Sequence, residues 1–486
     1  MIRLTLLILF VLFLWVYAFR DWMVSLCGLI LLTFLLSKKG GMLTPIDGIL
    51  GLNLWNITLA VVTLAWLQRR QEDRRPWKLS GLSVGIVGGY IGIIVLGYVQ
   101  AMLDMDAFPP HLQRDLWQFL TVDHLINPLK FIWVALLLAD GCNSRRRLMM
   151  ALGAVVGLGV LYAINVVKII PLEALQSGDG VHYRWRIGKE IGLMANDMAK
   201  VLALTFWSIL AIQRLWWRAW WSKIGVLAAY SVTFLGLAMC FSRAGYLSFV
   251  AVGFVLGCVR WRKLLWLGPP ALLLLVVLMP TVTERMSDGF DPDPEANTDW
   301  NEVTAGRTGE LWPPIIEEIW NAPFFGQGRL AIVHTPAYDK ILALGGVPLT
   351  PHNGYLEVLV DYGALGLLIV LAAFVGAGVL SYRLVRQNRE PLLVALGGVG
   401  LVHVTGCLVN AMSGGLLTPS QGMLGTLCVL GIVLRVWSSR VGLAKRTVRA
   451  SQDAWWYRPA AADQHLTEPC RLQPYLRGNE PPGRMS

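Results

Sequence analysis

The sequence has little charge. Of its 486 residues, 15% are Asp, Glu, Lys or Arg, whereas soluble domains carry roughly a quarter. Hydrophobic residues make up 55% of the chain, and the mean hydropathy is +0.55. This composition excludes an ordinary soluble domain and predicts an integral membrane protein. At about 20 residues for each spanning helix, the chain has room for about a dozen spans.

Cysteine is scarce where an oxidising compartment would use it. The seven cysteines lie within or beside apolar runs or in the C-terminal tail, and none lies in the long hydrophilic segment 282–352. The sequence therefore predicts no disulfide framework. The first apolar run also lacks a small-residue cleavage site, so we interpret it as a retained helix and not as a removed signal peptide.

Positive charge is in excess. Lys and Arg outnumber Asp and Glu by 42 to 31, which gives a net charge of +11. The basic residues form short clusters between apolar runs and no continuous stripe, so nucleic acid is not an expected partner. Under the positive-inside rule, such clusters mark cytoplasmic loops. The clusters occupy residues 68–78, 144–148, 214–223, 260–263 and 383–389.

Thirteen apolar runs are candidate spans, and the basic clusters fix their alternation from residue 68 onward. The segment 282–352 then lies outside the cytoplasm. Counting back places Lys38 and Lys39 outside as well, against the rule, so we expect one early run to be re-entrant or too short to cross. The prediction is an all-α polytopic membrane protein with about 12 transmembrane helices. The runs are residues 3–18, 22–36, 46–67, 80–102, 119–139, 147–168, 191–213, 222–241, 244–261, 263–281, 353–380, 391–411 and 419–437.

This pattern divides the chain into four predicted parts. Residues 1–281 form an N-terminal transmembrane bundle, and residues 282–352 form a periplasmic loop with short helices. Residues 353–437 form the C-terminal transmembrane helices. Residues 438–486 form a cytoplasmic tail that is polar and rich in proline, so we expect it to be disordered.

Two stretches of the loop have patterns of their own. ELWPPIIEEIW spaces apolar side chains at helical intervals, which predicts a short helix that either packs on the protein or lies flat on the membrane. The acidic stretch 291–302 has the ligand spacing of a calcium loop, but Ala296 stands where the sharp turn needs glycine. We therefore expect an acidic loop without an ion, and no metal site.

Titratable side chains gather on the predicted outer face. His352 precedes Asn353 at the mouth of a span, where an imidazole exchanges protons with water and is held by a rigid helix start. That position suits a general base, although a histidine that only caps the helix would look the same. Ser242 and Arg243 form a second outer turn, between two apolar runs.

Arginine outside the cytoplasm goes against the positive-inside rule and indicates an anionic partner. The outer segment before the span at 191–213 is also cationic, with Arg184, Arg186 and then Asn196 about one turn inside the helix. Guanidinium groups and an imidazole on one face are what a polyprenyl diphosphate requires, to hold its leaving group and to activate a hydroxyl. Binding of anionic phospholipid headgroups is the alternative.

Other titratable residues have less distinctive positions. Glu357 and Asp361 are four residues apart and share one helix face, so they orient the imidazole, line the cavity or form a plain interfacial pair. His124 and His403 lie within apolar runs. We expect both to be packed polar groups bonded to neighbouring helices.

Three stretches, in order, carry a resemblance to a known family. SRAGYLSF follows a span at 242–249, PFFGQG lies late in the outer loop at 323–328, and PHNGYLEVLVDYGALG leads into the next span at 351–366. Together they resemble the O-antigen ligase and Wzy-type polymerase superfamily of bacterial membrane glycosyltransferases. The resemblance extends over residues 180–410.

The resemblance implies roles for individual residues. It makes His352 the base that activates the acceptor and Arg243 the group that grips the donor diphosphate. A further catalytic arginine maps onto Arg186, and less directly onto Arg184. Family members often carry an Asn-Pro-Asn turn where this chain has MAND. The residues that we expect to bind the substrate around these groups are Arg184, Ser242, Asn196, Asn353, Tyr355 and Glu357.

The resemblance also implies a reaction. A glycan moves from a polyprenyl-diphosphate carrier to a hydroxyl of the lipid A core or of a growing glycan, at the periplasmic face of the cell inner membrane among its lipids. Because a diphosphate is already a good leaving group, positioned cations and a base replace a metal, and no cofactor is expected. The leading prediction is an O-antigen ligase, and the alternative with the same chemistry is a Wzy-type polymerase of O-antigen or exopolysaccharide, which adds one repeat unit at a time. A transporter or flippase would need ionisable residues at several depths, whereas the candidate cations crowd at one face.

Overall fold

The computed structural model describes residues 2–36, 53–73, 80–176, 180–217, 219–278, 282, 306–346, 350–414 and 417–444. Within these ranges every regular element is a helix, which confirms the predicted all-α class. The α-helices are α1 (Ile2–Ala18), α2 (Trp22–Leu36), α3 (Leu54–Asp73), α4 (Gly81–Leu103), α5 (Pro110–Gln113), α6 (Leu116–Phe119), α7 (Asn127–Gly141), α8 (Arg145–Ile169), α9 (Gly180–Ile191), α10 (Ala195–Trp216), α11 (Trp220–Ala238), α12 (Arg243–Val259), α13 (Lys263–Leu278), α16 (Trp312–Asn321), α17 (Ala331–His334), α18 (Ala337–Ala343), α19 (Gly354–Gln387), α20 (Pro391–Ala411) and α21 (Leu424–Ala444). Short 3-10 and π turns complete the set: η1 (Met105–Ala107), η2 (Leu120–Ile126), η3 (Leu172–Leu175), η4 (Arg307–Leu311) and η5 (Gln421–Met423).

Every predicted apolar run overlaps a helix of the structure. Among the residues that the structure describes, eight helical segments are long and apolar enough to cross a membrane, and three apolar helices are shorter. The protein is therefore a polytopic membrane protein, while the expected number of about 12 spans stays a prediction. The division into four parts stays a prediction too. Lys38, Lys39, the acidic stretch 291–302 and the tail beyond residue 444 lie outside the described residues.

Ion pairs hold two of the basic clusters, 68–78 and 144–148, at one end of the bundle. Arg147 pairs with Asp21 of the α1–α2 turn at 3.2 Å, and Arg145 pairs with Glu390 before α20 at 2.6 Å. Arg70, near the end of α3, pairs with Asp140 at the end of α7 at 3.2 Å. We call this the basic end. Helices α12 and α19 finish there, so their N-termini lie at the opposite end.

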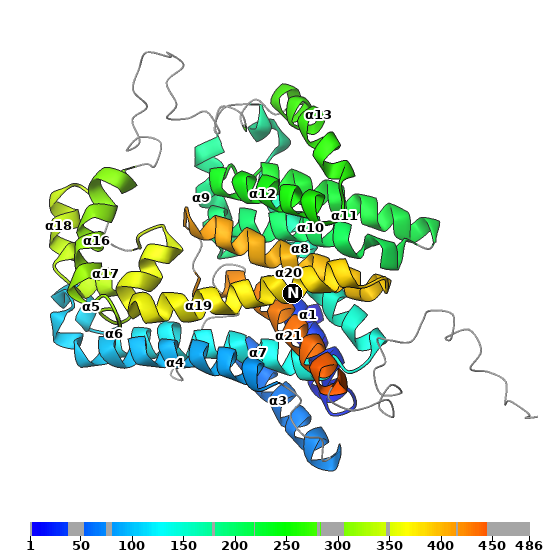
Figure 1. Cartoon of the computed structure of the whole chain (residues 1–486), viewed down its shortest axis with the longest axis horizontal. Helices are drawn as coiled ribbons and strands as arrows, with labels where there is room; N and C mark the ends of the chain where they lie inside the picture. Colours follow the sequence, from blue (N-terminus) through cyan, green and yellow to red (C-terminus); the bar gives the residue numbers. More distant parts are fainter. Residues whose placement is uncertain are drawn as a thin grey trace, which may run out of the picture.

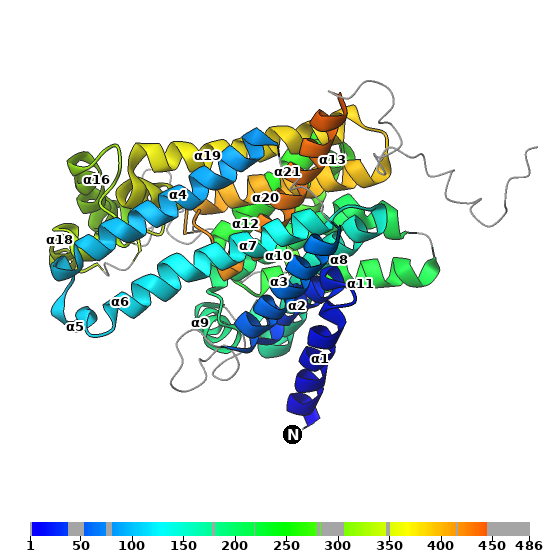
Figure 2. The ribbon, with the colours of Figure 1, turned by 90° about the horizontal axis from the view of Figure 1, so that it is seen from below.

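Helix α20 lies in the middle of the bundle, where α10, α12, α19 and α21 surround it. Figure 1 shows α19 running beside α4, with the loop helices α16, α17 and α18 around its first turns. Helix α1 projects from the bundle in Figure 2 and exposes apolar side chains along its length. Such a surface suits contact with lipid.

The chain of PFFGQG crosses α19 at a break in that helix. Gly363 has φ +68° and interrupts α19, and a Cβ on it would lie 2.3 Å from the carbonyl carbon of Phe324. Gly326 has φ +70°, and a Cβ there would lie 2.4 Å from the backbone nitrogen of Tyr362. Both positions need glycine because the two backbones touch. Four backbone hydrogen bonds of 2.8–3.1 Å join the segments, so these two motifs form one unit.

The predicted loop helix is present as α16. Its buried face packs Ile315 against Ile341 and Val360, while Ile316 and Trp320 are exposed. The helix is thus packed on the protein along one face and leaves an apolar strip uncovered.

Candidate active site

The N-termini of α10 and α12 are joined by one amide. Ser242 caps α12, and its Oγ accepts a hydrogen bond from the backbone nitrogen of Gly245 at 3.3 Å. The same hydroxyl donates to Oδ1 of Asn196, in the first turn of α10, at 2.7 Å. Ser242 is fully buried. The position of Asn196 therefore fixes the start of α12, where Arg243 is the first residue.

Arg184 joins the same amide from α9. Its Nη2 donates to Asn196 Oδ1 at 2.9 Å. Arg186 pairs with Glu190, one turn along α9, at 3.3 Å. Residues two apart on a helix do not share a face. Of the two arginines that the resemblance singled out, Arg184 therefore contacts Asn196, and Arg186 contacts its own helix.

Arg307, which the sequence analysis did not single out, is a third arginine of the site. It opens η4, and its Nη1 donates to the carbonyl oxygen of Ser413 at 3.0 Å. Burial and the nearby positive charge of Arg243 lower the pKa of Arg307. The two guanidinium groups thus lie close enough to repel each other, an arrangement that a bound anion relieves. Arg307 shares the sequence feature that singles out Arg243, since it is an arginine of the predicted outer face, away from the basic loops.

His352 stands beside this group, directly before α19. Its Nδ1 lies 3.5 Å from Oγ1 of Thr350. The imidazole is exposed, yet burial of part of the ring and the positive charge of Arg307 lower its pKa below 6.5. His352 is therefore neutral at neutral pH and able to accept a proton.

Asn353 and Tyr355 hold the start of α19. The Asn353 side chain caps the helix by accepting from the backbone nitrogens of Tyr355 and Leu356, at 3.0 and 3.3 Å. The Tyr355 hydroxyl donates to the carbonyl oxygen of Leu408 on α20 at 2.7 Å. These bonds fix the helix start that carries His352.

A turn after α20 closes the site. A Cβ on Gly414 would lie 3.7 Å from Nδ2 of Asn196 and 4.0 Å from the carbonyl oxygen of His352. Ser413, the residue before it, binds Arg307. The turn thus contacts α10, η4 and the start of α19. It brings Asn196, Arg307 and His352 around one small volume.

Backbone strain marks the same place. Phe241 has φ +47° and His352 has φ +50°, values that residues with a Cβ rarely adopt. Each immediately precedes the capping residue of a helix, Ser242 for α12 and Asn353 for α19. Such strain persists only where the surroundings enforce it, and it clusters at functional sites.

Glu357 and Asp361 have a different partner from the imidazole. Arg329 donates through Nη1 to Glu357 at 2.6 Å and to Asp361 at 2.5 Å. All three side chains are buried. Arg329 also donates through Nε to Nδ1 of His124 at 3.0 Å. The substrate-binding role expected for Glu357 stays a prediction, and in the structure the carboxylate anchors the loop arginine to α19.

The remaining polar groups fit simpler roles. His403 bonds Thr426 on the neighbouring α21 at 3.0 Å, as a packed histidine should. Glu317 pairs with Lys340 at an exposed position. Within the described ranges, no three His, Cys, Asp or Glu side chains form a group able to hold a metal ion.

The electrostatics of the site favour an anion. Three helix N-termini, those of α10, α12 and α19, meet there, and each carries a partial positive charge. Three guanidinium groups, from Arg184, Arg243 and Arg307, add full charges. We call these three residues the arginine cluster. Together with a neutral imidazole, the cluster can hold a phosphate-bearing leaving group and accept a proton.

The fold and this site define a class: a polytopic all-helical membrane protein with a cationic site at the end of the bundle opposite its basic loops. The profile of the O-antigen ligase family (Wzy_C) matches residues 228–371, from α11 into the first half of α19. The match includes Arg243, Arg307 and His352, and it confirms the resemblance seen in the sequence motifs. A search of the curated proteins finds no significant match to the chain. The match supports a membrane enzyme of the O-antigen ligase and polymerase type, acting on a polysaccharide or lipid-linked glycan.

Proposed function

We propose that the protein transfers a polysaccharide from a polyprenyl-diphosphate carrier to an acceptor hydroxyl, as O-antigen ligases do. The acceptor is the lipid A core or a similar hydroxyl-bearing molecule. The proposed reaction takes place at the periplasmic face of the inner membrane. The position of the arginine cluster and His352 opposite the basic end supports this side, because basic loops favour the cytoplasm. The observation that carries the proposal is the convergence of this cluster and His352 on three helix N-termini.

The reaction follows from the chemistry of the groups. The acceptor oxygen attacks the anomeric carbon of the first sugar, and its proton passes to the neutral imidazole of His352. The bond between that carbon and the carrier diphosphate breaks. The diphosphate leaves with the bonding electrons, and the arginine cluster stabilises its growing negative charge. The proton is later released from His352 to water.

Glycan analysis of cells that lack the protein tests the proposal. With a ligase missing, full-length chains accumulate on the carrier lipid and none reach the acceptor. If single repeat units accumulate on the carrier instead, the enzyme is a polymerase. Unchanged carrier-linked and acceptor-linked glycans would contradict both activities.

Variants at the two principal residues sharpen the test. His352→Ala should lower the transfer rate about 100-fold or more, since general-base catalysis contributes about that much. Arg243→Lys should lower it about 100-fold, because an ammonium group does not reproduce a two-pronged grip on phosphate. Transfer by the purified variants is compared with that of the wild type at equal amounts of folded protein. Near-normal rates would remove these two assignments.

A further inference from the structure

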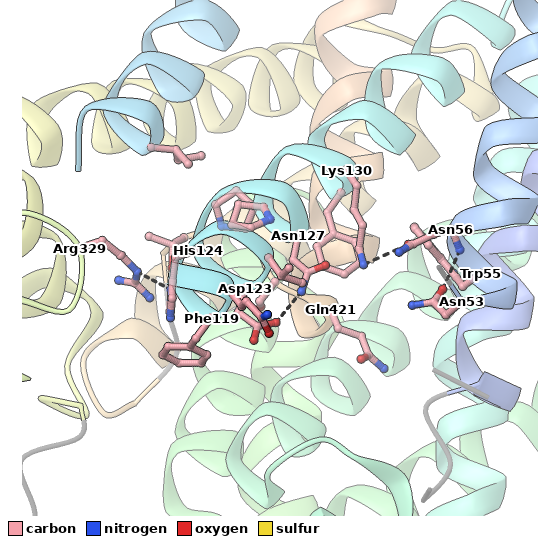
Figure 3. Close-up of a pocket in the computed structure, with 18 of the residues that line it drawn as sticks. Asn53, Trp55, Asn56, Phe119, Asp123, His124, Asn127, Lys130, Arg329 and Gln421 are labelled. Carbon is pink, nitrogen blue, oxygen red and sulfur yellow. Dashed lines mark hydrogen bonds between the residues drawn. The ribbon is translucent and has the colours of Figure 1, made fainter. Parts of the chain in front are cut away.

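A cavity lies away from the arginine cluster. Its volume is about 650 Å³, within the range of ligand sites in proteins. Its walls come from the start of α3, from the continuous helix α6–η2–α7, from Arg329 and from the segment 418–421 before α21 (Figure 3). The other ends of α3 and α7 meet at the basic end. The cavity therefore lies in the same half of the bundle as His352.

The walls of this cavity combine flat aromatic rings with side chains that both donate and accept hydrogen bonds. Aromatic rings come from Trp55, Phe119 and Phe131. The amides are Asn53, Asn56, Gln118, Asn127 and Gln421. Acidic groups (Asp115 and Asp123) and basic groups (Lys130 and Arg329) are both present. Mixed charge disfavours a polyanion. Apolar side chains make up much of the wall, but a lipid tail would offer no hydrogen-bond partners to the amides and charged groups among them.

A saccharide fits this lining. Amide and carboxylate groups pair with sugar hydroxyls, which act as donors and acceptors at once. Aromatic rings pack on the apolar C–H faces of sugar rings. Polar groups of the wall are already held in place, since Asn127 donates to Asp123 at 2.7 Å and Lys130 donates to Asn56 at 3.3 Å. Figure 3 marks both hydrogen bonds with dashed lines.

His124 supplies a second, independent sign of a ligand. Its Nδ1 accepts from Arg329, so the proton of the neutral ring is on Nε2. That Nε2 is buried and has no hydrogen-bond partner among the described residues. A buried donor without a partner is costly, and a ligand hydroxyl would satisfy it. His124 lies on the π turn η2, a feature frequent at functional sites.

An apolar cavity of about 500 Å³ adjoins the 650 Å³ cavity on the side of the candidate active site. It shares Phe119, His124 and Arg329 with the larger cavity, and its far wall includes Thr350 and Pro351, directly before His352. The two cavities thus lie in series from α3 to the mouth of α19.

We propose that the 650 Å³ cavity is a saccharide-binding site that holds the glycan chain next to the reacting sugar. This proposal rests on the proposed function, because the ligand is part of a substrate of that reaction. The shared chemistry is that of an oligosaccharide, whether it comes from the acceptor or from the donor chain.

Calorimetric titration of the full-length protein tests the site. The His352→Ala background is used because it slows transfer, and neither probe carries a diphosphate, so binding is measured without chemistry. Two probes are used: the core oligosaccharide released from lipid A of the host, and the repeat-unit oligosaccharide released from its carrier. We expect one of them to bind, and its identity shows whether the site serves the acceptor or the donor. Binding of neither probe would overturn the proposal.

Two tryptophan substitutions on one helix provide the matched comparison. Val122→Trp fills the cavity that Val122 lines, and it should weaken oligosaccharide binding at least tenfold. Ile126→Trp adds the same ring at an exposed position of η2 outside the cavity, and it should leave the affinity unchanged. Equal affinities for the two variants would contradict the site.

A third variant guards against misfolding. If Val122→Trp lowers the melting temperature more than Ile126→Trp does, the affinity of Asn127→Ala for the oligosaccharide is measured instead. We expect that variant to lose affinity by about threefold or more.

Transfer by otherwise wild-type protein is measured separately. Oligosaccharide binding without transfer contradicts the proposed function and leaves the site standing. If the Val122→Trp variant transfers the glycan with an unchanged KM for the glycan substrates, the saccharide site is contradicted and the proposed function stands.

Discussion

At the scale of single residues, Arg307 is the link between the arginine cluster and the base. Its charge acts on His352, and it is itself affected by Arg243. A base that must be neutral benefits from a nearby cation, because the cation disfavours the imidazolium form. The same cation stabilises a departing diphosphate. Arg307 thus favours the neutral form of the base and also stabilises the leaving diphosphate in the proposed reaction.

The pH dependence of transfer should report this coupling. In the wild type, the rate falls on the acid side of a pKa below 6.5, as His352 becomes protonated. Arg307→Gln removes the positive charge, so the pKa of His352 rises and the acid limb moves to higher pH. Rates of the purified protein across pH measure the shift. The control is Lys189→Gln, a cation of α9 that stacks on Trp185 and should leave the limb in place. An unmoved limb in Arg307→Gln would refute the coupling.

Arg184 and Arg186 differ in their partners, so their variants should differ in effect. Arg184→Gln removes a charged donor to Asn196 and should lower transfer about tenfold or more. Arg186→Gln breaks only a half-exposed pair with Glu190, and such pairs contribute little. The ratio of the two kcat values measures the difference. A larger loss for Arg186→Gln would show that Arg186, onto which the resemblance maps the further catalytic arginine, is the functional residue. The contact of Arg184 with Asn196 would then not identify it.

At the scale of elements, the docking of the loop on α19 positions the mouth of the site. The backbone of 323–328 lies against the break at Gly363, and Arg329 follows at once with its buried carboxylate partners. Breaking such a buried network by removing one partner leaves uncompensated charge. The loop therefore cannot shift without disturbing the helix start that carries His352.

Gly363→Ala should destabilise the protein. A Cβ at φ +68° collides with the backbone of Phe324, and the strain of the left-handed conformation alone costs about 1–3 kcal/mol. The melting temperature in detergent measures the loss. Gly92→Ala is the matched control, because a Cβ there meets nothing within 4 Å in the middle of α4 and alanine favours a helix. A melting temperature for Gly363→Ala at or above that of Gly92→Ala would contradict the docking.

At the scale of the whole molecule, hydropathy was enough to find the helices. Every apolar run overlaps a helix, because length and apolar content determine what a membrane accepts. The boundary of α3 was less accurate, since the run was expected at 46–67 and the helix is Leu54–Asp73. Its charged last turn continues as helix with Arg69 paired to Glu72. Polar helix ends are invisible to a hydropathy criterion.

The site was predictable in its residue types and less so in its contacts. The position of Arg243 and His352 away from the basic loops followed from charge and alternation. Whether Arg184 or Arg186 contacts Asn196 depends on which face of α9 points toward the site. The sequence does not determine that rotation, because both arginines lie on the same short helix. Glu357 and Asp361 were correctly placed on one face, but their partner Arg329 lies 28 and 32 residues away. Only the folded loop brings it there.

The most direct test of the account is the affinity of the purified His352→Ala protein for a polyprenyl diphosphate. The arginine cluster at three helix N-termini predicts tighter binding of the diphosphate than of the monophosphate. A second substitution, Arg243→Gln, should weaken diphosphate binding about tenfold or more, whereas Lys189→Gln should not. Equal affinity for diphosphate and monophosphate, or equal binding by the two double variants, would contradict the central claim.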